Sequence, residues 1–192
     1  MEPSVGSNRH PSDKNGFARL TANSDVILHV LACRESSVMQ LTQFLDFEAI
    51  RVDLAAGNKR QLLNQLAQIA AARLSLDPSV IADSIGERER LGSTGFGGGV
   101  AIPHGKLAQL DHVYALVARL ASPIDYKAID GQPIDLVFLL LSPPDAGAEH
   151  LKALAAISRL VRHGGIVDKL RGARSRDAMS AVLMGAEERD AA

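Results

Sequence analysis

A histidine between a proline and a glycine is the residue of this chain with the clearest potential for chemistry. His104 follows Pro103 and precedes Gly105, at the end of an apolar run at residues 100–102 that comes after a glycine-rich stretch. Proline fixes the path of the backbone and glycine adds no bulk, so the imidazole is presented to a large reactant such as another protein. A neutral imidazole is a nucleophile near pH 7 and can accept a phosphoryl group. The alternative is a glycine-rich hairpin whose histidine lies at a turn by chance.

A phosphoryl group on His104 would add close to two negative charges and would need donors nearby. Arg88 lies at the end of the helix predicted before the glycine-rich stretch, and its guanidinium can bind phosphate oxygens bidentately. Ser93 and Thr94 carry hydroxyl donors on the adjoining strand. A helix that begins near Asp145 offers free N–H groups at its N-terminus. These groups are the predicted phosphate-supporting set.

A second histidine, His150, lies in the first turn of that helix and shares a face with Leu154, Ile157 and Val161. It is therefore expected to point toward the sheet. A helix N-terminus disfavours a protonated imidazole, so we expect His150 to be neutral and to make one hydrogen bond beside His104. The alternative is a core histidine whose hydrogen bond goes to a backbone group.

Two segments of the chain resemble a known family. Residues 88–95, followed by 100–106, look like the active-site segment of the enzyme IIA domains of the bacterial phosphotransferase system, in the fructose/mannitol class and most closely its nitrogen-regulatory branch. A second match lies at Glu149-His150-Leu151, at the start of a helix. The resemblance covers roughly residues 39–184.

The resemblance implies that the Pro-His-Gly histidine is phosphorylated at Nε2, and that the second histidine and the arginine support it. Those roles fall on His104, His150 and Arg88. The resemblance also implies a cytoplasmic phosphotransferase without a cofactor, whose donor is a phosphocarrier protein of the HPr type in its nitrogen-branch form, NPr, and which binds regulatory target proteins. Two alternatives remain open: a fructose or mannitol transport component that passes phosphate to a IIB domain, and an interaction module that no longer transfers phosphate.

Composition excludes several other classes. The net charge is −1 with 46% hydrophobic residues, so no global charge draws the chain to nucleic acid or a membrane surface. The one cysteine, Cys33, cannot form an internal disulfide. Residues 26–33, the longest apolar candidate, are too few to span a membrane and are interrupted by His29. The sequence has no HExxH or cysteine metal spacing and no dinucleotide or Walker glycine pattern, so we expect neither metal nor nucleotide.

The chain divides into three parts by composition and periodicity. Residues 1–38 are predicted to be an N-terminal extension without fixed structure, because residues 1–23 are rich in Ser, Asn, Gly and Pro and lack apolar periodicity. Residues 39–186 are predicted to form the IIA domain, and residues 187–192 a frayed tail. Phe96 and Ile102 are expected to form an apolar rim that keeps water away from the transfer.

Alternating helices and apolar strands predict an α/β fold, a single domain with helices on both faces of a mixed sheet. Strands are expected at 50–54, 93–96, 100–102, 113–120 and 134–141, and helices at 41–46, 58–74, 77–89, 147–163, 166–170 and 176–183. The stretch 134–141 is continuously apolar and is predicted to be buried on both faces. Val80, Ile81 and Ile85 are expected to face inward from one helix, and Leu151 from another.

Overall fold

The computed structural model describes residues 39–190 together with Met1. The predicted N-terminal extension otherwise lies outside the described residues. Residues 39–190 belong to one compact unit. Its elements in chain order are η1 (Leu41–Gln43), η2 (Phe47–Ala49), β1 (Arg51–Leu54), α2 (Lys59–Leu74), α3 (Pro78–Arg90), β2 (Gly95–Gly97), β3 (Val100–Ala101), β4 (His104–Lys106), β5 (Tyr114–Ile124), β6 (Ile134–Ser142), α4 (Gly147–Arg162), α5 (Gly164–Gly172) and α6 (Arg176–Asp190).

Strand β6 lies in the middle of the sheet, whose strand order is β1-β5-β6-β3-β2. It runs antiparallel to β5 on one side and parallel to β3 and β4 on the other. Every residue of β6 except Asp135 is buried. The continuous apolar stretch is therefore a strand covered on both faces, as the sequence predicted.

Strands β3 and β4 lie end to end along the same side of β6 and keep the same register against it. Ile102 and Pro103 separate them, and the backbone N–H of Leu140 donates to the carbonyl of Pro103 at 3.0 Å. Proline has no N–H to donate, so the strand is interrupted while its alignment is retained. The interruption places His104 at the start of β4, opposite Leu140.

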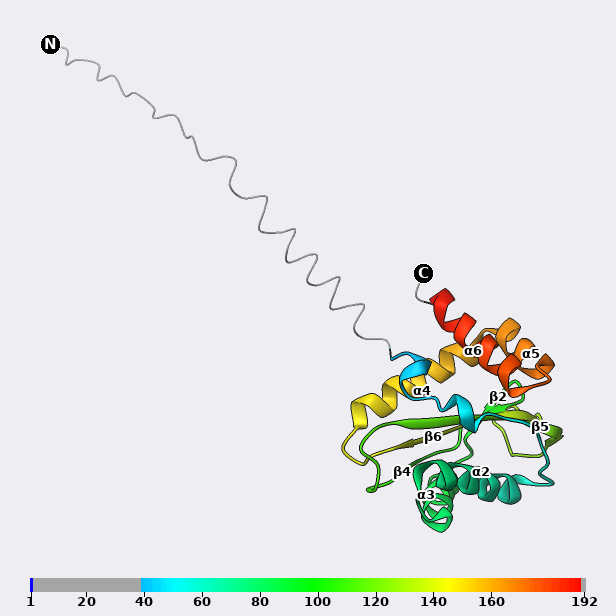
Figure 1. Ribbon diagram of the computed structural model, residues 1–192. Helices are drawn as coiled ribbons and strands as arrows, with labels where there is room; N and C mark the ends of the chain where they lie inside the picture. Colours follow the sequence, from blue (N-terminus) through cyan, green and yellow to red (C-terminus); the bar gives the residue numbers. More distant parts are fainter. Residues whose placement is uncertain (2–38, 191–192) are drawn as a thin grey trace. The chain divides into compact units, whose positions relative to one another are not determined.

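Helices cover both faces of the sheet, as predicted. α2 and α3 pack on one face, and α4, α5 and α6 on the other (Figure 1). Successive residues of a strand point to opposite faces. Accordingly, Leu116 and Leu139 belong to the core on the α2–α3 side, whereas Val117 and Phe138 belong to the core on the α4–α6 side. The central strands thus contribute to both cores at once.

Two helices of the sheet-covering layer begin at residues whose side chains cap them. The side chain of Asn58 accepts a hydrogen bond from the backbone N–H of Gln61 at 2.9 Å at the start of α2. Asp77 caps α3 by accepting from the N–H of Ser79 at 2.8 Å, and Pro78 is the first helical residue. Both arrangements satisfy backbone donors that a helix leaves free at its N-terminus.

The structure corrects the predicted end of β5. Ser122 and Pro123 do not end the strand, which continues to Ile124. The register between β5 and β6 shifts after Arg119, so the proline falls in an irregular stretch of the ladder. A proline is tolerated at such a position because no ladder hydrogen bond needs its missing N–H.

Other boundaries and faces also differ from the prediction. The expected helix at 41–46 is a 3-10 turn, η1, followed by a second, η2. Val80 and Leu151 are exposed rather than inward-facing, because the buried stripe of each helix runs one position away from them. α6 continues to Asp190, seven residues beyond its predicted end, so residues 187–190 of the predicted tail extend the helix.

The contact between β2 and the β5–β6 connection generates a prediction about Gly95. A Cβ at this position would lie 2.6 Å from the Cα of Ala128, a backbone atom that cannot rotate away. We expect Gly95→Ala to lower the free energy of unfolding by about 1–3 kcal/mol, measured by urea denaturation. Gly86→Ala is the control, because its Cβ position has no described atom within 4 Å apart from its chain neighbours and the backbone of its own helix, and alanine favours the helix. Equal stabilities of the two variants would contradict this packing.

Candidate functional site

The ring of His104 is held by hydrogen bonds at both nitrogens. Its Nδ1 lies 2.8 Å from the carbonyl oxygen of Ile102, and its Nε2 lies 2.8 Å from Nε of Arg88. A carbonyl can only accept, so the proton of the ring lies on Nδ1. A guanidinium can only donate, so Nε2 carries the lone pair. The geometry therefore makes Nε2 the nucleophilic atom.

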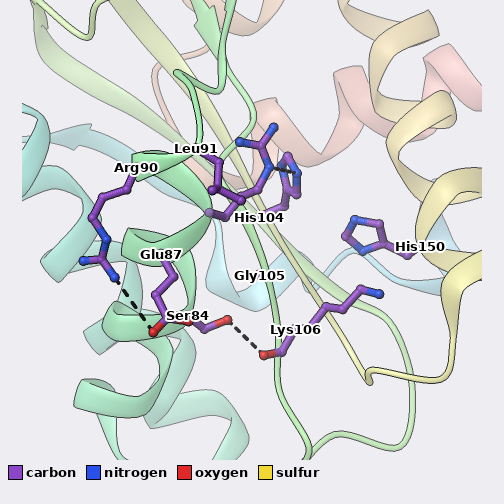
Figure 2. Close-up of a pocket in the computed structure, with 9 residues that line it drawn as sticks. Ser84, Glu87, Arg90, Leu91, His104, Gly105, Lys106 and His150 are labelled. Carbon is purple, nitrogen blue, oxygen red and sulfur yellow. Dashed lines mark hydrogen bonds and ion pairs between the residues drawn. The ribbon is translucent and has the colours of Figure 1, made fainter.

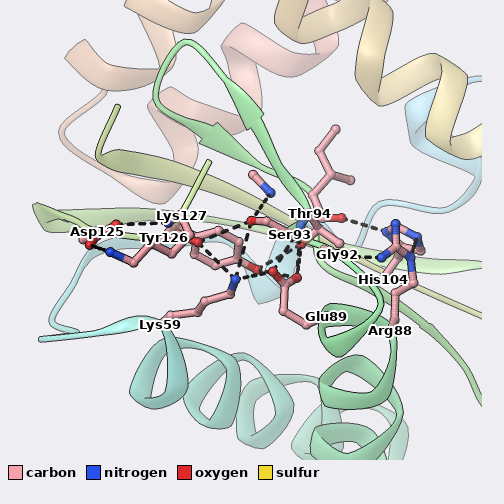
Figure 3. A network of polar contacts seen from close by, with 12 residues as sticks. Lys59, Arg88, Glu89, Gly92, Ser93, Thr94, His104, Asp125, Tyr126 and Lys127 are labelled. Atoms are coloured by element: carbon pink, nitrogen blue, oxygen red, sulfur yellow. Dashed lines mark hydrogen bonds and ion pairs between the residues drawn. The ribbon is translucent and has the colours of Figure 1, made fainter. Parts of the chain in front are cut away.

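Arg88 reaches His104 from the last turn of α3, as the sequence suggested. Its Nη1 donates to the carbonyl of Gly92 at 3.0 Å, while Nε donates to the imidazole (Figure 3). One planar guanidinium thus contacts both the backbone after the helix and the ring of His104. Because a guanidinium has a fixed fork of donors, this double contact orients it at Nε2.

His150 lies in the first turn of α4 and is buried. Its Nδ1 is 2.8 Å from Oγ of Ser142, the last residue of β6. Its ring centroid is 5.5 Å from that of His104, with the planes at 57°. The structure therefore brings His104, His150 and Arg88 together. The hydrogen-bond partner of His150, however, is a side chain that the sequence analysis did not single out.

Both imidazoles are biased toward the neutral form. Burial lowers the pKa of His104, and the nearby charge of Arg88 lowers it further, while the hydrogen bond to Ile102 opposes them. Burial, followed by the charges of His104 and Lys106, lowers the pKa of His150 to about 4. His150 is therefore neutral at pH 7, as expected, but burial rather than the helix N-terminus is the main cause.

An open cavity of about 650 Å³ lies over this group. Its lining includes His104, His150 and Lys106 (Figure 2). Arg88 and Arg90 add two further cations. The volume is larger than a phosphoryl group alone requires, so the cavity also has room for a side chain from another protein.

Ser93 and Thr94 do not line the cavity. Ser93 donates its hydroxyl to the carbonyl of Tyr126 at 3.3 Å. Thr94 bonds to the carboxylate of Glu89 and lies 3.0 Å from the hydroxyl of Tyr126. The structure thus corrects their predicted role as direct phosphate donors, because both hydroxyls are already engaged on the far side of the loop (Figure 3).

The partners of these hydroxyls form a buried polar network behind the site. Lys59 of α2 makes an ion pair with Glu89, and its Nζ lies 4.3 Å from the ring centroid of Tyr126. Burial by itself would raise the pKa of Glu89, but hydrogen bonds from Lys59 and Thr94 hold it below its usual value. Glu89 is the chain neighbour of Arg88, so the network fixes the end of α3 that carries the arginine.

No local pattern in the sequence indicates this network. Lys59 and Tyr126 are far from Glu89 along the chain, and no motif connects them. Ser142 lies one residue beyond the predicted strand 134–141 and belongs to no motif. Lys106 belongs to the quoted motif but received no role, although its Nζ lies at the cavity and 3.4 Å from the carbonyl of Pro144.

The structure also differs from the predicted roles of Gly105 and of the apolar rim formed by Phe96 and Ile102. A Cβ at Gly105 would lie 2.5 Å from Oγ of Ser84 and 3.2 Å from the backbone N of Ile85, so this glycine allows α3 to pack on β4 rather than a partner to approach. Ile102 is buried in the core, and Phe96 packs against the same core. The apolar residue exposed at the cavity is Leu91, with 86% of its surface accessible.

The described residues provide no other obvious chemistry. Within 39–190, no three His, Cys, Asp or Glu side chains are arranged to hold a metal ion. No helix in the same range is both long and apolar enough to cross a membrane. The histidine pair and its cationic surroundings are therefore the candidate site.

The mixed sheet with helices on both faces, and the paired histidines beside its central strand, define the class of phosphotransferase IIA domains. The family model of the phosphoenolpyruvate-dependent sugar phosphotransferase system, EIIA 2, matches residues 43–185. The chain belongs to this family. The resemblance inferred from residues 88–106 and 149–151 is thus confirmed.

Individual relatives agree with this assignment. The chain is 48% identical over 145 residues to a "Nitrogen regulatory protein" of Bradyrhizobium diazoefficiens, covering 76% of this chain and 95% of the relative. It is 37% identical over 153 residues to that of Escherichia coli, covering 79% and 93%. The crystal structure of nitrogen regulatory protein IIA-Ntr from Neisseria meningitidis matches with a TM-score of 0.70 and 32% identity, over 73% of this chain and 97% of that one.

The low pKa of His150 predicts a pH dependence of stability. The unfolded chain has the ordinary pKa of 6.5, whereas the folded protein has about 4. Between these values the unfolded state binds a proton that the folded state does not, so the free energy of unfolding falls as the pH decreases through this window. The loss is up to about 3 kcal/mol at roughly 1.36 kcal/mol per pKa unit.

The measurement is urea denaturation at pH 7 and pH 4.5 of the native protein and of His150→Gln, which cannot bind the proton. We expect a smaller loss of stability between the two pH values in the variant. Carboxylates and His104 titrate in both proteins, so the difference isolates His150. The same loss in both proteins would show that the pKa of His150 is not depressed.

Proposed function

We propose that this protein is a nitrogen-regulatory phosphocarrier, which accepts a phosphoryl group on Nε2 of His104 from an HPr-type phosphocarrier protein, the nitrogen-branch form NPr. The observation that carries the proposal is the ring of His104. Nδ1 is bonded to a backbone carbonyl, so the lone pair lies on Nε2, where it accepts a hydrogen bond from Nε of Arg88, and the ring lines the open cavity. The names of the similar proteins support the regulatory part of the proposal.

The transfer is an exchange of one N–P bond for another. The hydrogen bond from Nε of Arg88 to Nε2 of His104 is first released, and the freed lone pair forms the new bond to phosphorus as the bond to the donor nitrogen breaks. The donor nitrogen keeps the electron pair of the broken bond, and the proton on Nδ1 of His104 stays in its bond to Ile102. No proton has to move for the step to proceed, so the protein has mainly to position groups and stabilise charge.

The surroundings of His104 suit a group that carries close to two negative charges. Arg88, Arg90 and Lys106 line the cavity, against one carboxylate among the described residues there, that of Glu87. Arg88 already contacts Nε2, so its guanidinium is in reach of a phosphoryl group bonded to that atom. Charge-assisted hydrogen bonds of this kind are the stronger ones in proteins.

Phosphorylation would change the charge of a surface that is open to other proteins. The cavity carries cations next to the exposed Leu91, and a phosphoryl group would neutralise much of that positive charge. A target protein that binds the cationic cavity through acidic residues would then be bound less tightly. A target with basic residues would be attracted by the phosphoryl group. Regulation by phosphorylation state needs no larger rearrangement than this.

A sugar-transport role remains the second candidate, because the family is described as a sugar phosphotransferase family. In that role the protein would pass its phosphoryl group to a IIB domain. Transfer to a purified fructose or mannitol IIB domain would favour it. A pure interaction module, the third candidate, would show no transfer at all.

Phosphorylation in vitro tests the proposal. The protein is mixed with phosphoenolpyruvate, enzyme I and NPr, and its intact mass is measured. We expect one acid-labile phosphoryl adduct on the native protein and none on His104→Ala. His112→Ala is the matched control, because this histidine is exposed and bonds only to the neighbouring Asp111 among the described residues, and it should accept the adduct normally. Native protein without an adduct from either NPr or HPr would refute the transfer function.

A second prediction concerns Arg88. Arg88→Lys keeps a positive charge but loses the fork that contacts Nε2 and the backbone of Gly92. We expect kcat/KM for phosphoryl transfer to fall about 10- to 100-fold, which corresponds to the loss of a charged hydrogen bond. Rapid-quench measurement of phosphoprotein formation provides the rate. An unchanged kcat/KM would show that the charge alone is sufficient.

A further inference from the structure

Ser142 occupies a distinctive position beside the histidine pair. It is the last residue of β6, it is fully buried, and its carbonyl accepts from the N–H of Leu107 at 2.9 Å. It also pairs with Lys106 across the sheet, two residues after His104 on β4. The backbone of Ser142 is therefore fixed next to the site, and its hydroxyl has a defined position.

That hydroxyl has one hydrogen-bond partner within the described part of the chain, Nδ1 of His150 at 2.8 Å. Because Nδ1 faces buried Ser142 and His150 lines the cavity, the opposite nitrogen, Nε2, is the one that can face the cavity. The proton of a neutral imidazole can lie on either nitrogen. Which one carries it decides whether His150 offers the cavity a donor or an acceptor.

The burial of Ser142 distinguishes the two arrangements. If Nδ1 of His150 donated to Ser142, the hydroxyl proton would be buried without an acceptor, which costs free energy. If the hydroxyl donates to Nδ1, its proton is satisfied. The proton of the ring then lies on Nε2, at the cavity, where water or a ligand can accept it. The second arrangement leaves no buried donor unpaired.

We propose that Ser142 is a positioning residue that holds His150 in the tautomer protonated at Nε2, so that a neutral imidazole donates an N–H to the phosphoryl group on His104. The catalytic part of this inference rests on the proposed phosphocarrier function. The tautomer itself does not, since it belongs to the unphosphorylated protein. The centroid separation of 5.5 Å puts the two rings close enough to share one phosphoryl group.

A neutral donor has a specific advantage at this place. Arg88 and Lys106 already supply full positive charges around the cavity. A third cation there would face both of them and would have to be buried, as His150 is. A neutral N–H adds a hydrogen bond to phosphate without that repulsion. Ser142 would thus select the neutral tautomer of His150 that is protonated at Nε2 and can donate a hydrogen bond.

The first test is the tautomer of His150 in the unphosphorylated protein, read from the ¹⁵N shifts of its ring nitrogens by long-range ¹H–¹⁵N NMR. We expect a protonated Nε2 and a bare Nδ1 in the native protein, and loss of this preference in Ser142→Ala. Ser84→Ala is the matched control for the tautomer, because it removes another hydroxyl at the cavity, bonded to the carbonyl of Lys106. A native His150 protonated at Nδ1 would overturn the proposal, whether or not the protein accepts phosphate.

The second test is the rate of phosphoryl transfer to the Ser142 variants. We expect Ser142→Ala to reduce kcat about five- to tenfold, with a smaller effect on KM, since one neutral hydrogen bond is lost after the partner binds. Ser142→Thr, which keeps the hydroxyl, should restore both the tautomer and the rate. If Ser142→Ala folds and retains both the native tautomer and kcat, Ser142 has no positioning role. A native protein that accepts no phosphate would refute the phosphocarrier function, while the tautomer measurement would still decide the role of Ser142.

Discussion

The hydrogen bond between Nδ1 of His104 and the carbonyl of Ile102 determines which nitrogen of this ring carries the lone pair. The bond exists because Pro103 separates β3 from β4 without shifting their register against β6. The carbonyl two residues before the histidine is thereby directed at the ring instead of at a neighbouring strand. A proton is held on Nδ1 as a result, and the nucleophilic lone pair is held on Nε2, where Arg88 meets it.

Electrostatic balance is the second constraint on the site. Two imidazoles lie close together among cations, and burial keeps both of them toward the neutral form. An imidazole must be neutral to act as a nucleophile. Two neutral rings also do not repel each other, as two adjacent positively charged rings would. In the proposed phosphocarrier function, the cations of the cavity would then be available to bind a phosphoryl group.

A polar network at the end of α3 holds the site in place. The carboxylate of Glu89 makes an ion pair with Lys59 and accepts hydrogen bonds from the hydroxyls of Thr94 and Tyr126. A half-satisfied network of this kind would destabilise the fold, but here each carboxylate oxygen has at least one donor. The hydroxyls that sequence reasoning assigned to phosphate instead hold the helix that carries the arginine. Their contribution to the site is therefore indirect.

The sequence by itself determined the α/β class, the buried central strand and the family. Each of these depends on local signals: apolar periodicity, and motifs confined to short segments such as 88–106. It also indicated His104, His150 and Arg88, because their residue types and spacing belong to those motifs. Only the tertiary structure decided which groups bond to the two ring nitrogens of His104, that Ser142 is the partner of His150, and that Thr94 faces Glu89 rather than the cavity. Hydrogen-bond direction and burial depend on residues brought together from distant elements, and no local pattern in the chain encodes that proximity.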